Sequence, residues 1–383
     1  MKIAIPKERR PDEARVAASP DTVKKYVALG FDVVIEAGAG DGSSIPDAAF
    51  SEAGATIGAD IDEVVGDADI VLCVQRPDEA AIGKMKPNAI LIGSLSALTS
   101  GDDVARYAGA GITSFALELL PRISRAQSMD ILSSQSNLAG YKAVLDAAGV
   151  FSRAFPMMMT ASGTIRPARV LVLGAGVAGL QAIATARRLG AVVSAYDVRP
   201  VVKEQVESLG AKFVEVDSEA TKEAETAGGY AKEMTAEYQA KQAQVLADAV
   251  AKSDISICTA LIPGRQAPVL ITEEMVKSMQ PGSVIVDLAV EQGGNCPLSE
   301  IGQVVVKHGV KIVGYANVPS RIATDATAMY AKNLLNFVIP MVDAETKTLA
   351  VDWEDEIIQG CLVTRDGNIV HPMLNQDKAA EAG

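Results

Sequence analysis

Residues 170–190 read VLVLGAGVAGLQAIATARRLG, an apolar run followed by a glycine-rich turn and a stretch with helical periodicity. In a GxGxxG turn the first glycine permits a tight bend and the second admits a pyrophosphate to the backbone. The third lets the helix pack on the strand. The helix N-terminus then offers N–H donors and a positive dipole end to phosphates. The stretch predicts a dinucleotide-binding βαβ unit, whose expected contacts are Gly174, Gly176, Val177, Ala178 and Gly179.

The next apolar run ends at Asp197, eighteen residues beyond Gly179. A carboxylate at this strand end accepts hydrogen bonds from ribose hydroxyls and repels a 2′-phosphate, which predicts NAD(H) as the cofactor. Arg199 could hold such a phosphate, but we expect the carboxylate of Asp197 to determine the preference for NAD(H). The residues expected around the two riboses are Asp197, Val198 and Arg199, with Thr259, Ala260 and Leu261 after the fourth strand of this series.

Strand-like runs alternate with helix-like runs along the chain, which is typical of parallel sheets covered by helices. We predict the α/β class, with two Rossmann-like doubly wound parallel-sheet domains joined by crossover helices at 134–149 and 324–342. The first domain should comprise residues 1–133 plus 325–383, and the NAD-binding domain residues 134–324. The expected strands are 2–6, 31–38, 69–74, 89–95 and 111–119, then 168–175, 191–197, 211–216, 254–261, 282–290 and 309–317.

One segment, 217–244, interrupts this alternation with an acidic, alanine-rich sequence that contains Gly228 and Gly229. Insertions longer than roughly 12–15 residues in a compact domain are often lids or binding loops. A solvated loop extended by a helix is equally compatible with these residues.

The composition excludes several classes of function. The 383 residues carry a formal charge of −13, which argues against nucleic acid as a partner. Four scattered cysteines without a CxxC, and two histidines, indicate reduced thiols of a cytosolic protein and no metal site. The N-terminus has no signal-peptide h-region, and no apolar run approaches the ~20 residues of a membrane span. We expect Met157, Met158 and Met159 to be adaptable packing residues.

Several motifs together resemble the alanine dehydrogenase and nicotinamide nucleotide transhydrogenase superfamily over nearly the whole chain. They are IPKERRPDEARVAASP (5–20), GSSIPDAAFSEAGA (42–55), the glycine turn, YDVRP (196–200) and PGSVIVDLAVEQGGN (281–295). In alanine dehydrogenases a lysine and a histidine hold the substrate and handle protons. The resemblance places Gln75 and Ser96 at those positions here, while Arg15, which resembles the substrate-binding arginine, is kept. Forming or breaking C=O or C=N requires proton transfer, so these substitutions argue against an amino-acid dehydrogenase.

The polar stretch PRISRAQSMDILSS (121–134) contains no histidine, cysteine or lysine. Hydride transfer between two nicotinamides needs no proton donor or acceptor, only two rings held at near-attack distance. The stretch resembles a loop around the nicotinamide in the NAD(H)-binding component of proton-translocating transhydrogenases. By that resemblance Gln127 bridges the nucleotides, Asp130 and Ser133 hold the carboxamide, and Arg122 pairs with Asp130 or reaches a phosphate. Cofactor contacts are implied for Gln127, Ser128, Met129 and Asp130, and for Gly229 and Tyr230 in the insertion.

The resemblance therefore implies an NAD(H)-binding component, expected as a separate polypeptide and a homodimer, that passes hydride to NADP(H) on a partner subunit. A membrane-spanning subunit would complete a proton-translocating complex, with this chain cytoplasmic and peripheral to the inner membrane. Two alternatives remain open at this point. One is a soluble NAD-dependent amino-acid dehydrogenase of the alanine type, and the other is a non-catalytic NAD-binding regulator.

Overall fold

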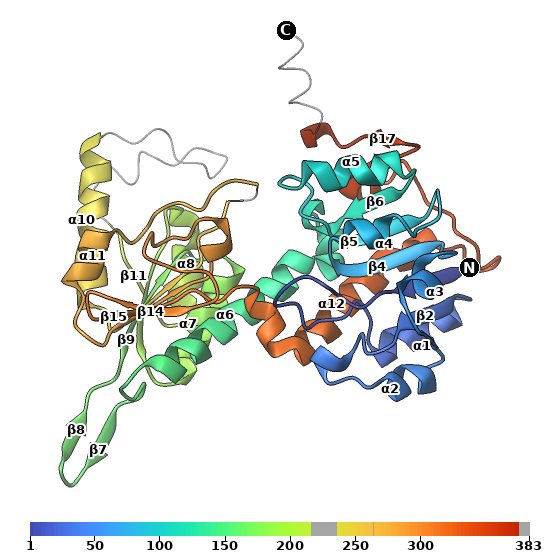
Figure 1. The fold of residues 1–383 in the computed structure, drawn as a ribbon. Helices are drawn as coiled ribbons and strands as arrows, with labels where there is room; N and C mark the ends of the chain where they lie inside the picture. Colours follow the sequence, from blue (N-terminus) through green and yellow to red (C-terminus); the bar gives the residue numbers. More distant parts are fainter. Residues whose placement is uncertain (216–235, 263, 375–383) are drawn as a thin grey trace. The chain divides into compact units, whose positions relative to one another are not determined.

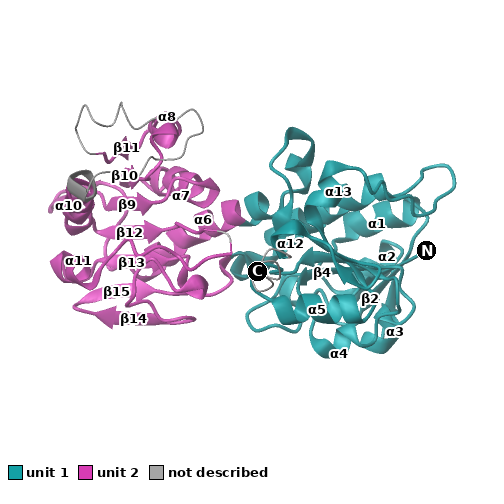
Figure 2. Ribbon diagram, turned by 90° about the horizontal axis from the view of Figure 1, so that it is seen from above, with its two compact units in different colours: residues 1–135, 319–383 teal, residues 136–318 magenta. Residues whose placement is uncertain are grey.

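A computed structural model describes residues 1–215, 236–262 and 264–374, and it divides into two compact units (Figures 1 and 2). Unit 1 comprises Met1–Gln135 and Pro319–Gly383, and unit 2 comprises Ser136–Val318. The sequence-based boundary at 324/325 was therefore too late, because residues 319–324 group with unit 1. Of the two expected crossovers, α6 (Ile131–Val150) contains a boundary, whereas α12 (Ala323–Val338) lies within unit 1.

Unit 1 is built on a sheet with the strand order β17-β16-β6-β5-β4-β1-β2-β3, parallel from β6 to β3. The five predicted strands are present as β1 (Lys2–Ile5), β2 (Asp32–Glu36), β4 (Ile70–Gln75), β5 (Ile90–Ser94) and β6 (Thr113–Ala116). Three short strands were not predicted: β3 (Thr56–Gly58), β16 (Leu362–Arg365) and β17 (Asn368–Ile369). Since β16 pairs antiparallel with β6, the C-terminal portion of the chain returns to the first sheet.

Two apolar clusters form the core of unit 1, one containing Tyr26, Phe50 and Phe115 and the other Tyr107 and Leu91. Their apolar side chains come from the buried strands and from the inward faces of the helices. The α-helices of this unit are α1 (Pro20–Ala28), α2 (Asp47–Glu52), α3 (Ile61–Val65), α4 (Glu79–Ile82), α5 (Gly101–Gly109), α12 and α13 (Glu356–Cys361). The 3₁₀ helices are η1 (Asp41–Ser43), η2 (Leu117–Leu119), η3 (Ser124–Met129), η6 (Val318–Ile322), which starts in unit 2, and η7 (Ile339–Met341).

Unit 2 has the strand order β11-β10-β9-β12-β13-β15-β14, parallel except for the edge strand β14. Its strands are β9 (Arg169–Leu173), β10 (Val192–Tyr196), β11 (Lys212–Phe213), β12 (Ile255–Cys258), β13 (Val284–Asp287), β14 (Val304–Lys307) and β15 (Val310–Val313). Its helices are α7 (Val177–Arg188), η4 (Pro200–Val202), α8 (Lys203–Ser208), α10 (Ala236–Lys252), α11 (Glu273–Ser278) and η5 (Val290–Gln292). The predicted class of two parallel-sheet α/β domains is confirmed, but residues 236–244 of the expected insertion belong to α10.

A hairpin of β7 (Met158–Thr160) and β8 (Gly163–Ile165) projects from unit 2 (Figure 1). Met157, Met158 and Met159 are 58%, 41% and 78% exposed, so they do not belong to the core of this chain. Each strand of the hairpin has three residues, too short for an alternating pattern to reveal it in the sequence.

Within the described residues, no helix is both long and apolar enough to cross a membrane. The same portion of the chain contains no group of three or more His, Cys, Asp or Glu side chains arranged to hold a metal ion.

Candidate functional site

The glycine turn of unit 2 joins β9 to α7, and Gly176 is the N-cap residue of that helix. Gly174 has a φ of +98°, and a Cβ there would lie 2.7 Å from Thr259 Oγ1. A Cβ on Gly179 would lie 1.8 Å from the carbonyl oxygen of Gly174. The fold itself therefore requires both glycines. At Gly176 an added Cβ would meet nothing within 4 Å, which leaves open space beside a helix N-terminus. That space suits a pyrophosphate.

Asp197, directly after β10, faces this turn. Its Oδ2 accepts a hydrogen bond from the N–H of Ala175 at 2.7 Å. Burial alone would raise the pKa of Asp197, but hydrogen bonds from Arg199 and from the Ala175 N–H outweigh it and lower the pKa. Arg199 binds the carboxylate in a bidentate manner, with Nε to Oδ1 and a terminal nitrogen to Oδ2 both at 2.9 Å. Arg199 could bind a 2′-phosphate, but it is paired with Asp197. The carboxylate of Asp197 would repel such a phosphate.

The loop after β12 approaches the glycine turn through Thr259, whose hydroxyl donates to the Gly174 carbonyl at 3.0 Å. Ala260 is held by Asn295, which accepts from its N–H at 3.1 Å and donates to its carbonyl at 2.9 Å. Leu261 is 46% exposed. Thr259 and Ala260 therefore border the glycine turn, and Leu261 presents an apolar side chain to solvent.

Sequence reasoning missed Asn295, which is fully buried and also donates to the Pro268 carbonyl at 2.7 Å. Its own N–H binds the carboxylate of Asp287 at the end of β13, at 3.1 Å. That carboxylate further accepts from Cys296 N–H and from the Ser299 hydroxyl. The motif PGSVIVDLAVEQGGN contained both residues, but only the fold shows that they shape the loop bordering the nucleotide turn.

In unit 1 the stretch 121–134 forms η3 and the first turn of α6. Asp130 caps that turn, accepting hydrogen bonds from the N–H and the hydroxyl of Ser133. Gln127 and Ser128 are exposed, and Met129 is buried. The turn therefore brings Asp130 and Ser133 together, with Gln127 exposed on the preceding 3₁₀ helix.

For Arg122, the structure excludes one of the two expected roles, pairing with Asp130, and leaves the phosphate contact as a prediction. Arg122 is exposed and does not pair with Asp130, and its guanidinium has no ion pair within the ranges of the chain that the structure describes. Arg125 instead binds both carboxylate oxygens of Asp355 at 2.5 and 2.8 Å, which ties η3 to the start of α13. Two further predicted contacts, Gly229 and Tyr230, lie outside the described residues.

The guanidinium of Arg15, which resembles the substrate-binding arginine of alanine dehydrogenases, is hydrogen-bonded to other side chains of this chain. Its Nε and one terminal nitrogen bind the carboxylate of Glu13 at 2.8 and 2.6 Å, and the other terminal nitrogen donates to Gln135 at 2.8 Å. Gln75 donates to the same Glu13 carboxylate at 2.7 Å. The polar groups that would hold a substrate carboxylate in a dehydrogenase therefore satisfy one another here.

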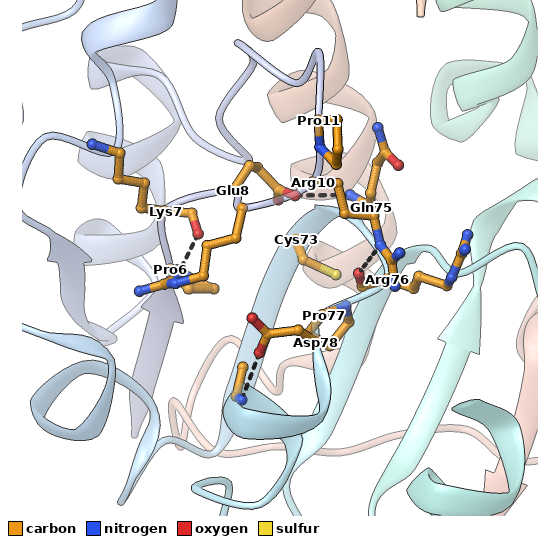
Figure 3. Close-up of a pocket in the computed structure, with 12 residues that line it drawn as sticks. Pro6, Lys7, Glu8, Arg10, Pro11, Cys73, Gln75, Arg76, Pro77 and Asp78 are labelled. Atoms are coloured by element: carbon orange, nitrogen blue, oxygen red, sulfur yellow. Dashed lines mark hydrogen bonds between the residues drawn. The ribbon is translucent and has the colours of Figure 1, made fainter. Parts of the chain in front are cut away.

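A pocket of about 180 Å³ opens at the carboxyl ends of β1 and β4 in unit 1 (Figure 3). Glu8 lines it and accepts hydrogen bonds from the N–H groups of Val74 and Gln75 at 2.5 and 3.3 Å. Burial raises the pKa of Glu8 to about 8, so this carboxyl is mostly protonated at neutral pH. Ligand pockets for drug-sized molecules measure roughly 300–1,000 Å³, so this one is too small for a dinucleotide.

A strand–glycine turn–helix with an acid at the end of the next strand defines a Rossmann-type dinucleotide-binding protein. More narrowly, the chain belongs to the alanine dehydrogenase/PNT family. The family model of the N-terminal domain matches residues 4–139, and that of the C-terminal domain matches residues 143–372. The resemblance inferred from the sequence motifs is confirmed.

The chain is similar both to relatives named as transhydrogenase subunits and to relatives named as alanine dehydrogenases. It is 64% identical, over 98% of its length and 99% of the relative, to the first section of the NAD(P) transhydrogenase alpha subunit of Rhodospirillum rubrum. It is 30% identical to an alanine dehydrogenase of Halomonas elongata, over 97% of this chain and 95% of that one. A transhydrogenase crystal structure from Sinorhizobium meliloti matches with a TM-score of 0.88 and 52% identity, covering 97% of this chain and all of that one.

Proposed function

We propose that this chain is the NAD(H)-binding component of a proton-translocating NAD(P) transhydrogenase, in which hydride passes directly from NADH to NADP⁺ bound on a partner subunit. The observation that carries the proposal is the 64% identity over 98% of the chain to a transhydrogenase alpha subunit. The engaged Arg15, with Gln75 and Ser96 in place of a lysine and a histidine, supports it against an amino-acid dehydrogenase.

The described residues can bind and orient a dinucleotide without moving a proton. The open space at Gly176 and the α7 N-terminus would receive the pyrophosphate, and Asp197 would accept from the adenosine ribose. Asp130 and Ser133 would hold the nicotinamide carboxamide and fix the rotation of the ring, and the Gln127 amide would bridge the two nucleotides. When bound, NADH supplies the hydride. The chain therefore has to position the nicotinamide ring and exclude water from it.

The names of the relatives support further subunits. The Rhodospirillum rubrum relative is named as one section of an alpha subunit, and the Haemophilus influenzae relative is a "subunit alpha" of which this chain covers 73%. We propose an NADP(H)-binding subunit and a membrane-spanning subunit as partners, which would place this chain on the cytoplasmic side of the inner membrane.

We also propose a homodimer, supported by the β7–β8 hairpin. Arg153 and Arg166, on either side of the hairpin, both bind Asp254 at 3.2 and 2.9 Å. An isolated two-stranded hairpin is marginally stable in water. The base of the hairpin is fixed by these ion pairs, and three exposed methionines lie on it. The hairpin is therefore suited to pack against a second copy.

Replacing Met158 and Met159 with glutamate is expected to halve the mass measured by light scattering, because charge on an apolar contact is costly to bury. Val306→Glu, at a 64% exposed position on β14, is the matched control and should leave the mass unchanged. A chain that is monomeric without substitution would contradict the dimer.

The test of the function is a stopped-flow reaction of this chain with NADH, a purified NADP-binding transhydrogenase domain and a spectrally distinct NADP analogue. Fast direct transfer is expected. In Gln127→Ala and Asp130→Ala the rate should fall by about 10²-fold while NADH still binds, since misplacement by ~1 Å can cost that much.

The other outcomes separate the alternatives. NAD⁺ reduction on addition of amino acids, without transfer to the analogue, would make the chain a dehydrogenase. NADH binding without either reaction would make it a regulator.

A further inference from the structure

The helix α12 carries polar side chains at every third position from 327 to 336: Thr327, Tyr330, Asn333 and Asn336. Side chains three residues apart are neighbours on a helix, and because a turn takes 3.6 residues the row winds gradually around the helix. The first three of these residues are buried, with exposures of 0%, 1% and 7%. Because buried polar groups need hydrogen-bond partners, this polar stripe indicates a set of specific contacts rather than solvation.

The first half of the stripe holds the ends of strands and the loop after β1. The Thr327 hydroxyl accepts from the N–H of Val16 at 3.1 Å. The Tyr330 hydroxyl lies 2.9 Å from the Val74 carbonyl, to which it donates, and 3.0 Å from the Ser94 N–H, from which it accepts. Tyr330 thus fixes the backbone at the carboxyl ends of β4 and β5, and Thr327 fixes the backbone at Val16.

The second half of the stripe holds the segment that carries Gln127. The side-chain amides of Asn333 and Asn336 both donate to one acceptor, the carbonyl oxygen of Ser128, each at 2.9 Å. The Asn333 Oδ1 in turn accepts from the Ser134 hydroxyl at 2.7 Å, which fixes which way its amide points. A carbonyl oxygen has two lone pairs, so these two donors satisfy it fully.

We propose that Asn333 and Asn336 are positioning residues for hydride transfer, acting through the Ser128 carbonyl on Gln127 and Asp130. The inference rests on the function proposed above. Gln127 is exposed and its backbone belongs to η3, so any displacement of η3 also displaces its amide. That backbone is a 3₁₀ helix, in which hydrogen-bond geometry is poor. Two donors from a buried helix therefore supply rigidity that the segment itself lacks.

Four variants and a control test the inference in the full chain. The variants are Asn333→Ala, Asn336→Ala, Asn336→Asp and the double alanine. Asn336→Asp keeps the shape of this half-buried side chain and replaces the donor with an acceptor. The control is Asn368→Ala, which removes a comparable amide contact to a carbonyl in the β16–β17 turn.

Three measurements apply to each protein: the NADH dissociation constant, the stopped-flow transfer rate, and hydrogen–deuterium exchange of residues 121–134. The transfer rate should fall ~3-fold in Asn336→Ala, ~10-fold in Asn333→Ala and ~10²-fold in the double variant, in proportion to the loosened positioning. Exchange of 121–134 should rise in the same order. NADH affinity should stay within about twofold, because the pyrophosphate site belongs to unit 2. Asn368→Ala should match the unmodified chain in all three.

A double-mutant cycle separates positioning from general destabilisation. Because part of the effect of Asn333 passes through Gln127, Asn333→Ala should lower transfer by a smaller factor in a Gln127→Ala background than in the unmodified chain. Equal fold-losses in both backgrounds would overturn the inference, as would unchanged exchange of 121–134 in the double alanine variant. If the unsubstituted chain transferred no hydride, the proposed function would be overturned instead. Hydrogen–deuterium exchange would still test whether Asn333 and Asn336 hold residues 121–134 in place.

Discussion

Gly176→Ala is expected to weaken NADH binding by at least ~10²-fold while leaving the unfolding temperature unchanged, because a methyl group would occupy the space that pyrophosphate needs. Gly176 has a φ of −78°, which alanine adopts without strain. Its Cβ would meet no protein atom within 4 Å. The substitution therefore acts on the ligand and not on the fold. Titration of NADH fluorescence, with thermal unfolding of the free protein beside it, measures both quantities.

Gly179→Ala is the matched comparison within the same turn. Its Cβ would lie 1.8 Å from the Gly174 carbonyl oxygen, so the backbone must move and the unfolding temperature should fall. If Gly176→Ala bound NADH as tightly as the unmodified chain, the dinucleotide would not approach this turn. The proposed pyrophosphate site at Gly176 would then be wrong.

Asp197→Asn is expected to change the ratio of NADH to NADPH affinity by ~10²-fold or more, since hydrogen bonds to charged groups contribute about 1.5–3 kcal/mol and a repulsion disappears as well. The asparagine can still accept from the Ala175 N–H, which the carboxylate now accepts at 2.7 Å, so the turn should keep its shape. Arg199, released from its bidentate pair, becomes free to bind a 2′-phosphate. Competition of NADPH against a fluorescent NADH complex measures the ratio.

Adding Arg199→Ala to Asp197→Asn should abolish the gain in NADPH affinity without restoring NADH affinity. The gain should also shrink as salt concentration rises, because an exposed ion pair is screened. An Asp197→Asn protein that still rejects NADPH would show that something other than this carboxylate sets the preference.

The sequence by itself predicted the features that depend on neighbouring residues. The glycine spacing from 174 to 179, the apolar runs of the parallel strands and the acid at 197 are local patterns, and a parallel strand between two helical layers is apolar along its length. The strand–turn–helix unit and the α/β class follow from them without knowledge of distant contacts. The motifs at both ends of the chain likewise placed it in its family.

Only the tertiary structure decided which polar groups meet across long stretches of sequence. Arg125 binds Asp355, and Asn333 binds the Ser128 carbonyl, over separations of 230 and 205 residues. Asn295 holds the loop at Ala260 in the same way. Such pairs leave no periodic signal, because an exposed and a buried asparagine look alike in a sequence. The three-residue strands of the hairpin are also too short to show a period, and folding alone determines that its methionines face solvent.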